Sequence, residues 1–396
     1  MRHHPQLLEW TRIVRRHLPH LSRAQARGLA TWSFGMVWTR SSSLTQIATF
    51  IAQLNGEKPN TVRNRLREWY QNAAAKSGTQ RTELNVRSCF APLLQWVLSL
   101  LPSGTTTLAL ALDATSLGQK FTILTISVLY RSCAIPVGWK VLPGCVKGAW
   151  KPEWQSLLAA FDGVVPPTWT VIVCADRGLY GDWLYEHIVS LGWHPLLRLN
   201  HQGTFRTPGQ KVWQPLTNVV PQPGTNWAGV VQCFKTNPIH CTLLARWAHG
   251  YTAPWLIATD LSPHQADCLW YGLRCWIECS YRDIKSDGWQ WQKTRLTDPQ
   301  RAERHWLAMA IATIWLLSVG SSSDADPPAP NTTEMPDHHQ ANSVASPSKR
   351  LRGMSCFLMG LLKILADLLN GQPIRMPSLL PQPWPGHPTP LGLNTS

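Results

Sequence analysis

Residues 107–130 read TLALALDATSLGQKFTILTISVLY and indicate neighbouring β-strands. In residues 107–115 leucines alternate with small residues, so the leucines lie on one face of the strand and Asp113 on the other. Residues 121–130 and 135–142 have the composition of two further strands, which predicts a meander. On this interpretation Asp113 ends the first strand of a sheet.

Strand and helix patterns alternate after the meander. Residues 152–161 and 180–191 are typical of helices. Between them, residues 169–175 (WTVIVCA) predict a buried strand that ends at Asp176, and residues 195–199 predict another short strand. Strands in a meander followed by a β-α-β unit predict an α/β fold, with a mixed sheet flanked by helices.

The carboxylates at the two strand ends are candidates for metal ligands. A charge at the end of a buried strand must be solvated, paired or bound to a metal ion. Asp113 and Asp176, joined by Glu278, would offer the hard oxygen ligands that Mg²⁺ prefers. Aspartates also cap turns after strands, and that structural interpretation remains open at this point.

Residues 271–285 (YGLRCWIECSYRDIK) predict a two-sided helix within a helical stretch from 263 to about 285. At about 100° per residue, one arc of about 60° gathers four polar side chains, namely Tyr271, Arg274, Glu278 and Lys285. Leu273, Trp276 and Ile277 fall on the opposite side, so we expect Trp276 to be buried. The alternative is a solvated Arg274–Glu278 pair on a surface helix. On either interpretation Arg274 contributes little to the fold, so its loss should barely change the melting temperature.

Positive charge is concentrated in the first quarter of the chain. The whole chain has a net charge of +15, and residues 1–100 hold 14 Lys and Arg against four Asp and Glu, a net charge of +10. Residues 44–54, Asn55-Gly56 and residues 62–70 predict a helix, a turn and a helix that carries Arg63, Arg65 and Arg67. This pattern favours a helix-turn-helix that binds nucleic acid, although a helical hairpin with a solvated Arg face would look the same.

Composition and punctuation divide the chain into segments. The prediction is a helical, basic DNA-binding region (1–103, with the helix-turn-helix candidate at 44–70), the first part of the α/β core (104–200), a β-rich insertion (201–260), the second part of the core with the helix of Glu278 (261–319), a disordered linker (320–350), and a C-terminal helix with a Pro-rich tail (351–396).

Several classes of protein fit the sequence poorly. The most apolar helical stretches, at 306–319 and 354–369, are too short or too charged to predict a membrane span. The start of the chain lacks an apolar signal region, so we expect a cytoplasmic protein. The ten cysteines form no C-x-x-C pair and the histidines no H-E-x-x-H, which argues against a disulfide framework and a structural zinc site.

Three motifs together resemble a known family. Tyr271-x₂-Arg274-x₃-Glu278-x₆-Lys285 is similar to the Y-R-E-K signature of DDE transposases of bacterial insertion sequences, of the insertion-sequence-four type. Residues 112–115 (LDAT) resemble the first-aspartate strand of that family, and residues 175–180 (ADRGLY) resemble its second-aspartate segment. The resemblance covers roughly residues 100–320.

The resemblance implies an RNase H-like core that gathers Asp113, Asp176 and Glu278 on Mg²⁺ or Mn²⁺. It implies cleavage of double-stranded DNA at terminal inverted repeats and transfer of the freed 3′-hydroxyl to a target site, by a homodimer in the synaptic complex and in association with the bacterial nucleoid. Members of the family often pass through a hairpin at the transposon end.

Further residues carry expected roles in DNA binding. By the same resemblance Tyr271, Arg274 and Lys285 would grip phosphates near the scissile bond, and Trp255 would lie near a flipped base. A core tryptophan in a strand is an equally good interpretation of Trp255, because the chain holds 22 tryptophans.

Two other functions compete with transposition. One is an RNase H-like nuclease that cleaves DNA without joining it, and the other is an inactive DNA-binding relic of a mobile element. All three carboxylates are present, so the sequence offers no support for a loss of activity.

Overall fold

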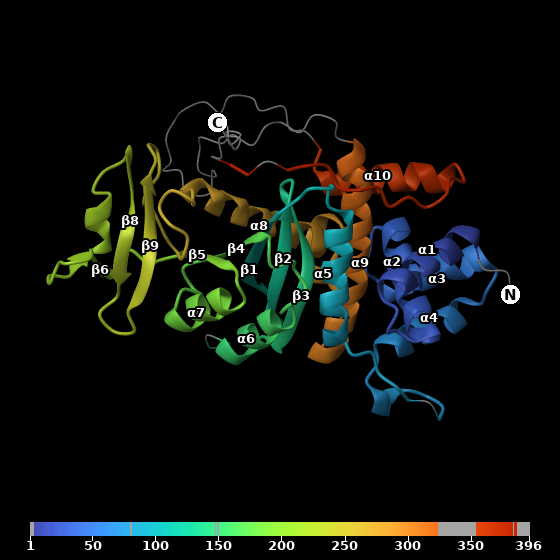
Figure 1. Cartoon of the computed structure of the whole chain (residues 1–396). Coiled ribbons are helices and arrows are strands. Elements are labelled where there is room, and N and C mark those ends of the chain that lie inside the picture. Colours follow the sequence, from blue (N-terminus) through green and yellow to red (C-terminus); the bar gives the residue numbers. More distant parts are fainter. Residues whose placement is uncertain are drawn as a thin grey trace.

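One mixed sheet of ten strands runs through the molecule (Figure 1). The computed structural model describes residues 4–79, 81–146, 148, 150–323, 354–382 and 384–385. Neighbouring strands follow the order β3-β2-β1-β4-β5-β10-β9-β8-β6-β7 within this part of the chain. The strands are β1 (Thr107–Leu117), β2 (Phe121–Tyr130), β3 (Cys133–Pro143), β4 (Thr170–Ala175), β5 (His194–Arg198), β6 (Thr204–Arg206), β7 (Gln214–Pro215), β8 (Thr225–Cys233), β9 (Ile239–Trp247) and β10 (Trp255–Thr259).

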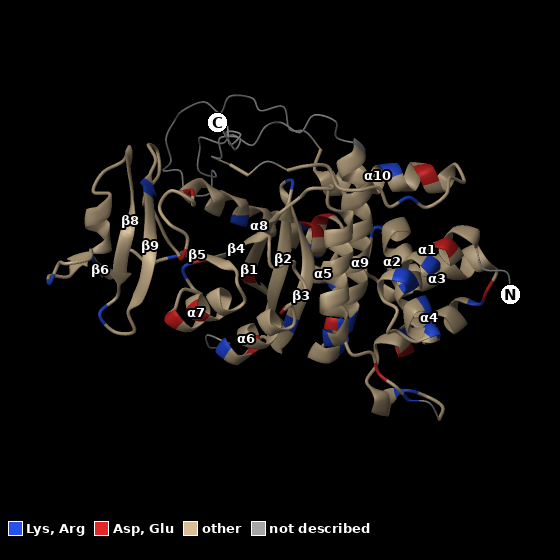
Figure 2. Cartoon of the chain, viewed as in Figure 1, with Lys and Arg blue, Asp and Glu red and all other residues tan. Residues whose placement is uncertain are grey.

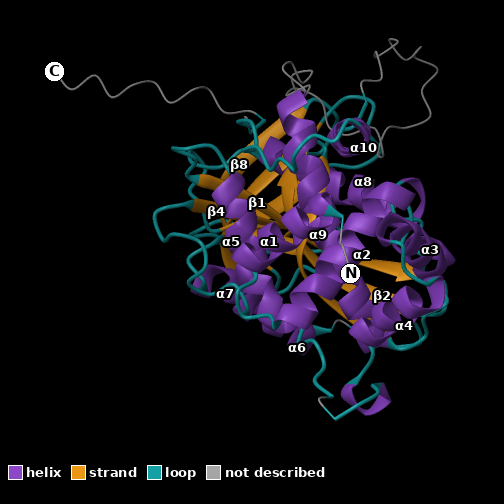
Figure 3. Cartoon of the chain, turned by 90° about the vertical axis from the view of Figure 1, so that its right-hand side faces the viewer, coloured by secondary structure: helices purple, strands orange, loops and turns teal. Residues whose placement is uncertain are grey.

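Helices cover the sheet and form a bundle at one side of it (Figure 1). The helices are α1 (Pro5–His17), α2 (Arg23–Thr39), α3 (Leu44–Asn55), α4 (Pro59–Tyr70), α5 (Phe90–Leu100), α6 (Lys151–Ala159), α7 (Asp182–Ser190), α8 (Trp276–Arg282), α9 (Pro299–Ser323) and α10 (Cys356–Leu369). Helix α9 stands between the sheet and the bundle of α1–α4, as Figure 3 shows from the bundle side.

The first five strands form the part of the sheet that the sequence predicts. β1, β2 and β3 pair antiparallel as a meander, and β4 and β5 continue the sheet parallel to β1. β1 lies between β2 and β4, and its residues 108–112 are all buried. The strand continues to Leu117, so Asp113 lies within β1 and does not end it. The prediction was wrong on this point because continued pairing with β2 extends β1 beyond its leucines.

The β-rich insertion is continuous with the main sheet. β10 pairs antiparallel with β5, through Ile257 opposite Arg198, and β9 and β8 extend the sheet from β10. The chain therefore leaves the sheet after β5, builds the strands at the far edge and returns beside β5.

The helix expected over 263–285 is broken into three forms. Residues Cys268–Cys275 form a 3₁₀-helix, α8 follows as a short α-helix, and Asp283–Asp287 form a π-helical turn. The uniform 100° spacing used to read this stretch was therefore wrong. Tyr271 and Arg274 nevertheless share a face, because residues three apart are eclipsed in a 3₁₀-helix.

Helix α9 is the central helix of the hydrophobic core. By length and composition its residues 299–322 could span a membrane, but 94% of the relevant window is buried inside the protein. It crosses α10 closely at Gly320 and Gly360, where an added Cβ on Gly320 would lie 1.9 Å from the carbonyl oxygen of Cys356. Glycine at this crossing lets the two helix backbones touch.

The N-terminal helices pack on the opposite side of α9. Trp10 of α1 stacks on Trp315 of α9, with ring centroids 4.3 Å apart. α3 ends at Gly56, which adopts a left-handed conformation (φ 67°), and α4 begins three residues later. The helix, turn and second helix predicted over 44–70 are thus present. Figure 2 shows Lys and Arg spread over this bundle with few acidic residues among them.

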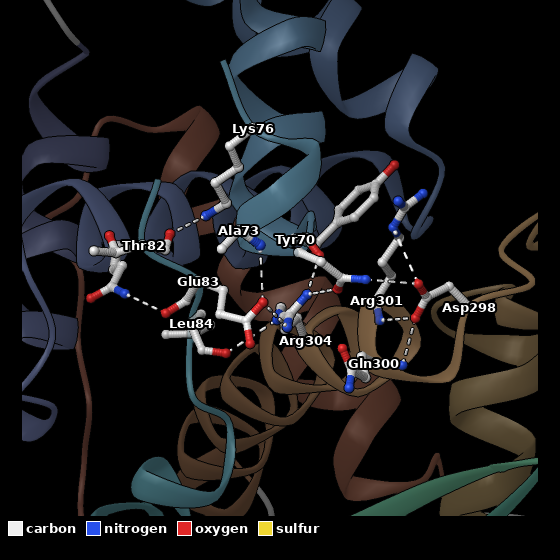
Figure 4. Close-up of polar contacts among 12 residues, drawn as sticks. Tyr70, Ala73, Lys76, Thr82, Glu83, Leu84, Asp298, Gln300, Arg301 and Arg304 are labelled. Atoms are coloured by element: carbon white, nitrogen blue, oxygen red, sulfur yellow. Dashed lines mark hydrogen bonds and ion pairs between the residues drawn. The ribbon is translucent and has the colours of Figure 1, made fainter. Parts of the chain in front are cut away.

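A buried arginine ties α9 to the chain that leaves the bundle (Figure 4). Arg304 donates to the carbonyl oxygens of Leu84 (3.1 Å) and Tyr70 (2.9 Å) and to the side-chain oxygen of Asn72 (2.6 Å). It also pairs with Glu83 at 3.3 Å. These contacts fix the segment after α4 against the start of α9.

The C-terminal part returns to the bundle and the core. Gln6 of α1 donates to the carbonyl oxygen of Gln372 (2.8 Å), and Ser318 of α9 donates to that of Pro377 (2.6 Å). The linker expected at 320–350 is wrong at its start, because α9 extends to Ser323 and buries Ser321. The rest of that segment lies outside the described residues.

Candidate active site

The sheet register brings two of the expected carboxylates side by side. β1 and β4 are parallel neighbours, and Leu112 lies opposite Ala175. Asp113 and Asp176 are the next residues on each strand, so both lie at the same level of the sheet. Each carboxylate accepts a hydrogen bond from the following backbone N–H, at 2.9 Å for Asp113 and 2.7 Å for Asp176.

Helix α8 brings Glu278 over this edge of the sheet. Ser280 donates to the carbonyl oxygen of Ala134 on β3 (2.9 Å), and the Tyr281 hydroxyl donates to the carbonyl oxygen of Asp113 (3.2 Å). Thr125 of β2 donates to that same carbonyl (3.1 Å). The buried polar contacts therefore hold α8 directly on the strand that carries Asp113.

The three carboxylates converge on one guanidinium group. Arg274 lies 3.3 Å from Asp113, 3.5 Å from Asp176 and 3.2 Å from Glu278. The Arg274 side chain is 12% exposed, whereas the acids are 18%, 40% and 47% exposed in the same order. The surface-pair interpretation of Arg274 and Glu278 was wrong, because Arg274 is drawn inward by two further carboxylates.

Electrostatics differ at the two aspartates. Burial raises the pKa of Asp113, and with the nearby charges of Asp176 and Glu278 it outweighs the lowering by Arg274 and the Ala114 N–H. At Asp176 burial also acts to raise the pKa, but Arg274, the Arg177 N–H and Arg198 together outweigh it and lower the pKa. The pair thus has unequal affinities for protons.

Tyr271 and Trp255 are parts of the interior wall of the site. The Tyr271 hydroxyl donates to Asp176 (3.4 Å), and its ring packs edge-on against Trp255, with centroids 5.2 Å apart. Trp255 is 2% exposed in the middle of the sheet. This burial favours the interpretation of Trp255 as a core tryptophan of a strand over a contact with a flipped base.

Lys285 reaches the same strand from the π-helical turn. Its ammonium donates to the hydroxyl of Thr115 (2.6 Å), which lies on β1 two residues after Asp113. Residues two apart on a strand face the same side. Burial lowers the pKa of Lys285, more than the attraction of Asp113 raises it.

The donor set suits a hard divalent cation. Three carboxylates supply oxygen ligands of the kind that Mg²⁺ prefers, and all three share the guanidinium of Arg274. The Nε of Arg274 is buried without a hydrogen-bond partner among the described residues. In that part of the chain no three His, Cys, Asp or Glu side chains are close enough to hold a metal ion, because the carboxylates surround Arg274 rather than one another.

The remaining predicted residues lie elsewhere. Arg63, Arg65 and Arg67 belong to α4, in the bundle on the other side of α9 from the sheet (Figure 1). Arg65 is engaged by Glu57 at 2.9 Å, whereas Arg63 and Arg67 are exposed. The structure therefore does not bring these arginines to the carboxylates.

One residue of the site escaped the sequence interpretation. Arg198 ends β5, is buried, and is close enough to Asp176 and Tyr271 to influence both pKa values. Leu197 of β5 lies opposite Ala175 of β4, so Arg198 and Asp176, which follow them, lie at the same level of the sheet. A charged residue at the end of a buried strand was the available signal, already used for the aspartates.

Part of the chain that forms this site matches a known protein family. Residues 152–315, about two fifths of the chain, match the family model described as a transposase DDE domain. That stretch contains Asp176 and Glu278, whereas Asp113 precedes it. A search of curated proteins found no match.

A solved structure also shows a weak likeness. The chain matches a piggyBac transposase, solved by cryo-electron microscopy as a synaptic complex with hairpin DNA, at 11% identity and a TM-score of 0.30 over 78% of each chain. A TM-score of this size does not establish a common fold.

Proposed function

We propose that this chain is a DNA transposase of the DDE class, related to bacterial insertion sequences, that cuts the ends of its element and joins the freed 3′-hydroxyl to target DNA. The carrying observation is the convergence of Asp113, Asp176 and Glu278, from two neighbouring strands and a covering helix, on a single cation. The match of residues 152–315 to a transposase DDE domain supports the same function.

Asp113, Asp176 and Glu278 would hold Mg²⁺ or Mn²⁺. Bound divalent ions would activate water and stabilise the leaving oxygen during phosphodiester cleavage. The convergence of three carboxylates on one guanidinium supports this assignment, because it gathers the hard oxygen ligands that a divalent ion prefers.

The cations of the site would bind the phosphate. Arg274 carries five N–H donors in a planar fork, a geometry that suits phosphate as well as carboxylate oxygens. Lys285 stands beside Thr115 on the same face of β1 as Asp113, where it would contact a neighbouring phosphate. Tyr271, whose hydroxyl donates to Asp176, would orient that carboxylate rather than touch DNA.

The rest of the proposal concerns architecture and partners. β1–β5 would form an RNase H-like core, which the meander joined to two parallel strands supports. The basic bundle, with α3 and α4 as a helix-turn-helix, would bind the terminal repeats, and two copies would meet in the synaptic complex. The protein would act in the bacterial cytoplasm, at the nucleoid.

Cleavage and joining of the DNA that flanks the element's own gene, in Mg²⁺, tests the proposal. We expect nicked or cut ends together with joined products in a supplied target duplex. Cleavage without joining would identify a nuclease, and end binding without cleavage in Mg²⁺ or Mn²⁺ would identify an inactive relic. Either result would overturn the proposed activity.

A further inference from the structure

A basic groove lies where the bundle meets the core, distinct from the carboxylate cluster. It encloses about 570 Å³ between the start of α3, helix α4 and the segment that follows Trp289. Ser43 and Gln46 line it from α3, Arg63 from α4, and Lys293 and Arg295 from the core. Three cations from two parts of the chain thus face one space.

Within the described residues, no carboxylate pairs with the cations of the groove. Arg63, Lys293 and Arg295 are exposed, and none of them forms an ion pair with a carboxylate within the part of the chain that the structure describes. Lys293 donates to the neutral side chain of Gln290 (2.9 Å). The described residues that line the groove include no Asp or Glu. Such a surface attracts a polyanion.

Neutral donors add to this charge. α3 is twelve residues long, and its first turn, capped by Ser43, opens on the groove. Unpaired N–H groups and the positive end of the helix dipole favour an anion there. His305 lines the same groove at 3% exposure, and neither of its ring nitrogens makes a well-formed hydrogen bond within the described chain.

The groove begins where the catalytic strand ends. From Asp113 to Leu117 β1 rises by about 13 Å, and the turn that follows carries Lys120. Lys120 donates to the carbonyl oxygen of Thr294, which lines the groove, at 2.9 Å. With Lys285 on Thr115, cations therefore occur along the path from the carboxylates to the groove.

We infer that this groove is a second site for duplex DNA, which binds the sugar–phosphate backbone of the segment flanking the bond held at the carboxylates. The inference rests on the proposed function and assigns Arg63 a place that the helix-turn-helix pattern alone does not give. The backbone is the expected ligand because the lining offers cations and N–H and hydroxyl donors, which bind phosphate oxygens without reading sequence.

Binding of a labelled 30-base-pair duplex to the full chain tests the site. The variant Arg63→Ala/Lys293→Ala/Arg295→Ala should bind about 10–100-fold more weakly, and the slope of log affinity against log salt should fall by about 2–3. Lys211→Ala/Lys235→Ala/Lys363→Ala removes the same charge from exposed positions outside the groove and should bind nearly as the unaltered chain does.

A second pair of variants changes charge without removing a contact that stabilises the fold. Gln46→Glu adds a negative charge to the groove at the third position of α3, where glutamate favours a helix. It should weaken duplex binding about 3–10-fold, as expected for a charge beside phosphates, without lowering the melting temperature. Gln210→Glu places the same charge at an exposed position outside both the groove and the bundle, and should leave binding unchanged.

The outcomes separate this inference from the proposed function. If both groove variants bind the duplex as tightly as the unaltered chain, while that chain still cleaves element ends, the groove is not a DNA site and the proposed function stands. If the groove variants lose binding but the unaltered chain cleaves no end in Mg²⁺, the groove stands and the proposed function fails.

Discussion

Two buried arginines occupy opposite kinds of surroundings in this protein. Arg304 meets two backbone carbonyls, one side-chain amide oxygen and one carboxylate. Arg274 meets three carboxylates and retains a buried Nε without a partner among the described residues. The first environment matches one positive charge with mostly neutral acceptors, and the second surrounds one positive charge with three negative ones.

The pKa directions follow this difference. Burial lowers the pKa of Arg304, and the nearby acids Glu83, Asp298 and Glu303 only partly oppose that effect. At Arg274 burial acts in the same direction, but Tyr271, Asp113, Asp176 and Glu278 outweigh it and raise the pKa. Arg304 is therefore a structural tie, whereas Arg274, which three carboxylates share, marks a candidate site for a bound cation.

The largest expected effect is on DNA cleavage, and it distinguishes the carboxylates around Arg274 from the carboxylate beside Arg304. Asp113→Asn, Asp176→Asn or Glu278→Gln should each reduce DNA cleavage by about 10³-fold or more, because each removes an oxygen ligand of the proposed metal site. Chelation of divalent ions should do the same. Glu83→Gln, beside Arg304, is the matched control and should leave cleavage within about threefold of normal. Gel assays of cleavage and of duplex binding measure both, and normal cleavage by any of the three site variants would refute the metal site.

The two arginines themselves provide the next test. Arg304→Met should lower the free energy of unfolding by about 2–4 kcal/mol, because two buried carbonyls lose their donor, and Mg²⁺ should not restore it. Arg274→Met should reduce cleavage by about 10–1000-fold, and millimolar Mg²⁺ should recover much of its lost stability by binding the exposed carboxylates. The melting temperatures of both variants, measured with and without Mg²⁺, test this difference. Equal responses of the two variants to Mg²⁺ would remove the distinction between them.

The sequence predicted the strands well because packing imposes regular patterns on them. Residues 121–130 were assigned as a strand with the bounds that β2 has, and the carboxylates were placed on the correct elements. Asp113 and Asp176 could be found because a charge beside a buried apolar strand is unusual. Their neighbourhood follows from parallel pairing of β1 and β4, which the sequence did not predict, because its β-α-β pattern concerns β4 and β5.

Other features depended on contacts between distant segments. The surroundings of Arg274 depend on three elements that no local period connects, so a pair four residues apart was the only visible partner. The stretch over 263–285 is broken into three helical forms, and its contact with β1 through Tyr281 joins residues 168 positions apart. The Arg304 tie joins residues 220 or more positions apart, which sequence spacing cannot reveal.

Acid should lower the stability of the folded protein through His305, which follows Arg304 on α9. Burial lowers the pKa of His305 to about 4, from about 6.5 in an unfolded chain. The unfolded chain therefore binds a proton between these values while the folded chain does not, so stability falls as the pH drops below about 6.5. By pH 4 the loss reaches about 3 kcal/mol.

The variant His305→Phe isolates this contribution. It retains an aromatic ring beside Trp32 but cannot be protonated. Urea unfolding at pH 7.5 and 4.5 should show a smaller decrease for the variant than for the unaltered chain, by about 2–3 kcal/mol. Identical decreases would mean that His305 is not held neutral in the folded state.

The smallest expected effect concerns Trp276, two residues after Arg274 in the chain. The sequence predicted it as a buried residue, but it is only partly buried against the core. A fully buried tryptophan costs about 3–5 kcal/mol when replaced by alanine, so Trp276→Ala should cost only about 1–2 kcal/mol because part of its ring already faces solvent. Cleavage in Mg²⁺ should be unchanged, since Trp276 makes no polar contact with the carboxylates in the described structure. Chemical denaturation and the cleavage assay on the same preparation test both statements. A loss of cleavage without a loss of stability would mean that the packing of Trp276 positions Arg274. The functional role of Arg274 would then depend on the apolar side of its own segment, whereas the structural role of Arg304 depends on its polar contacts.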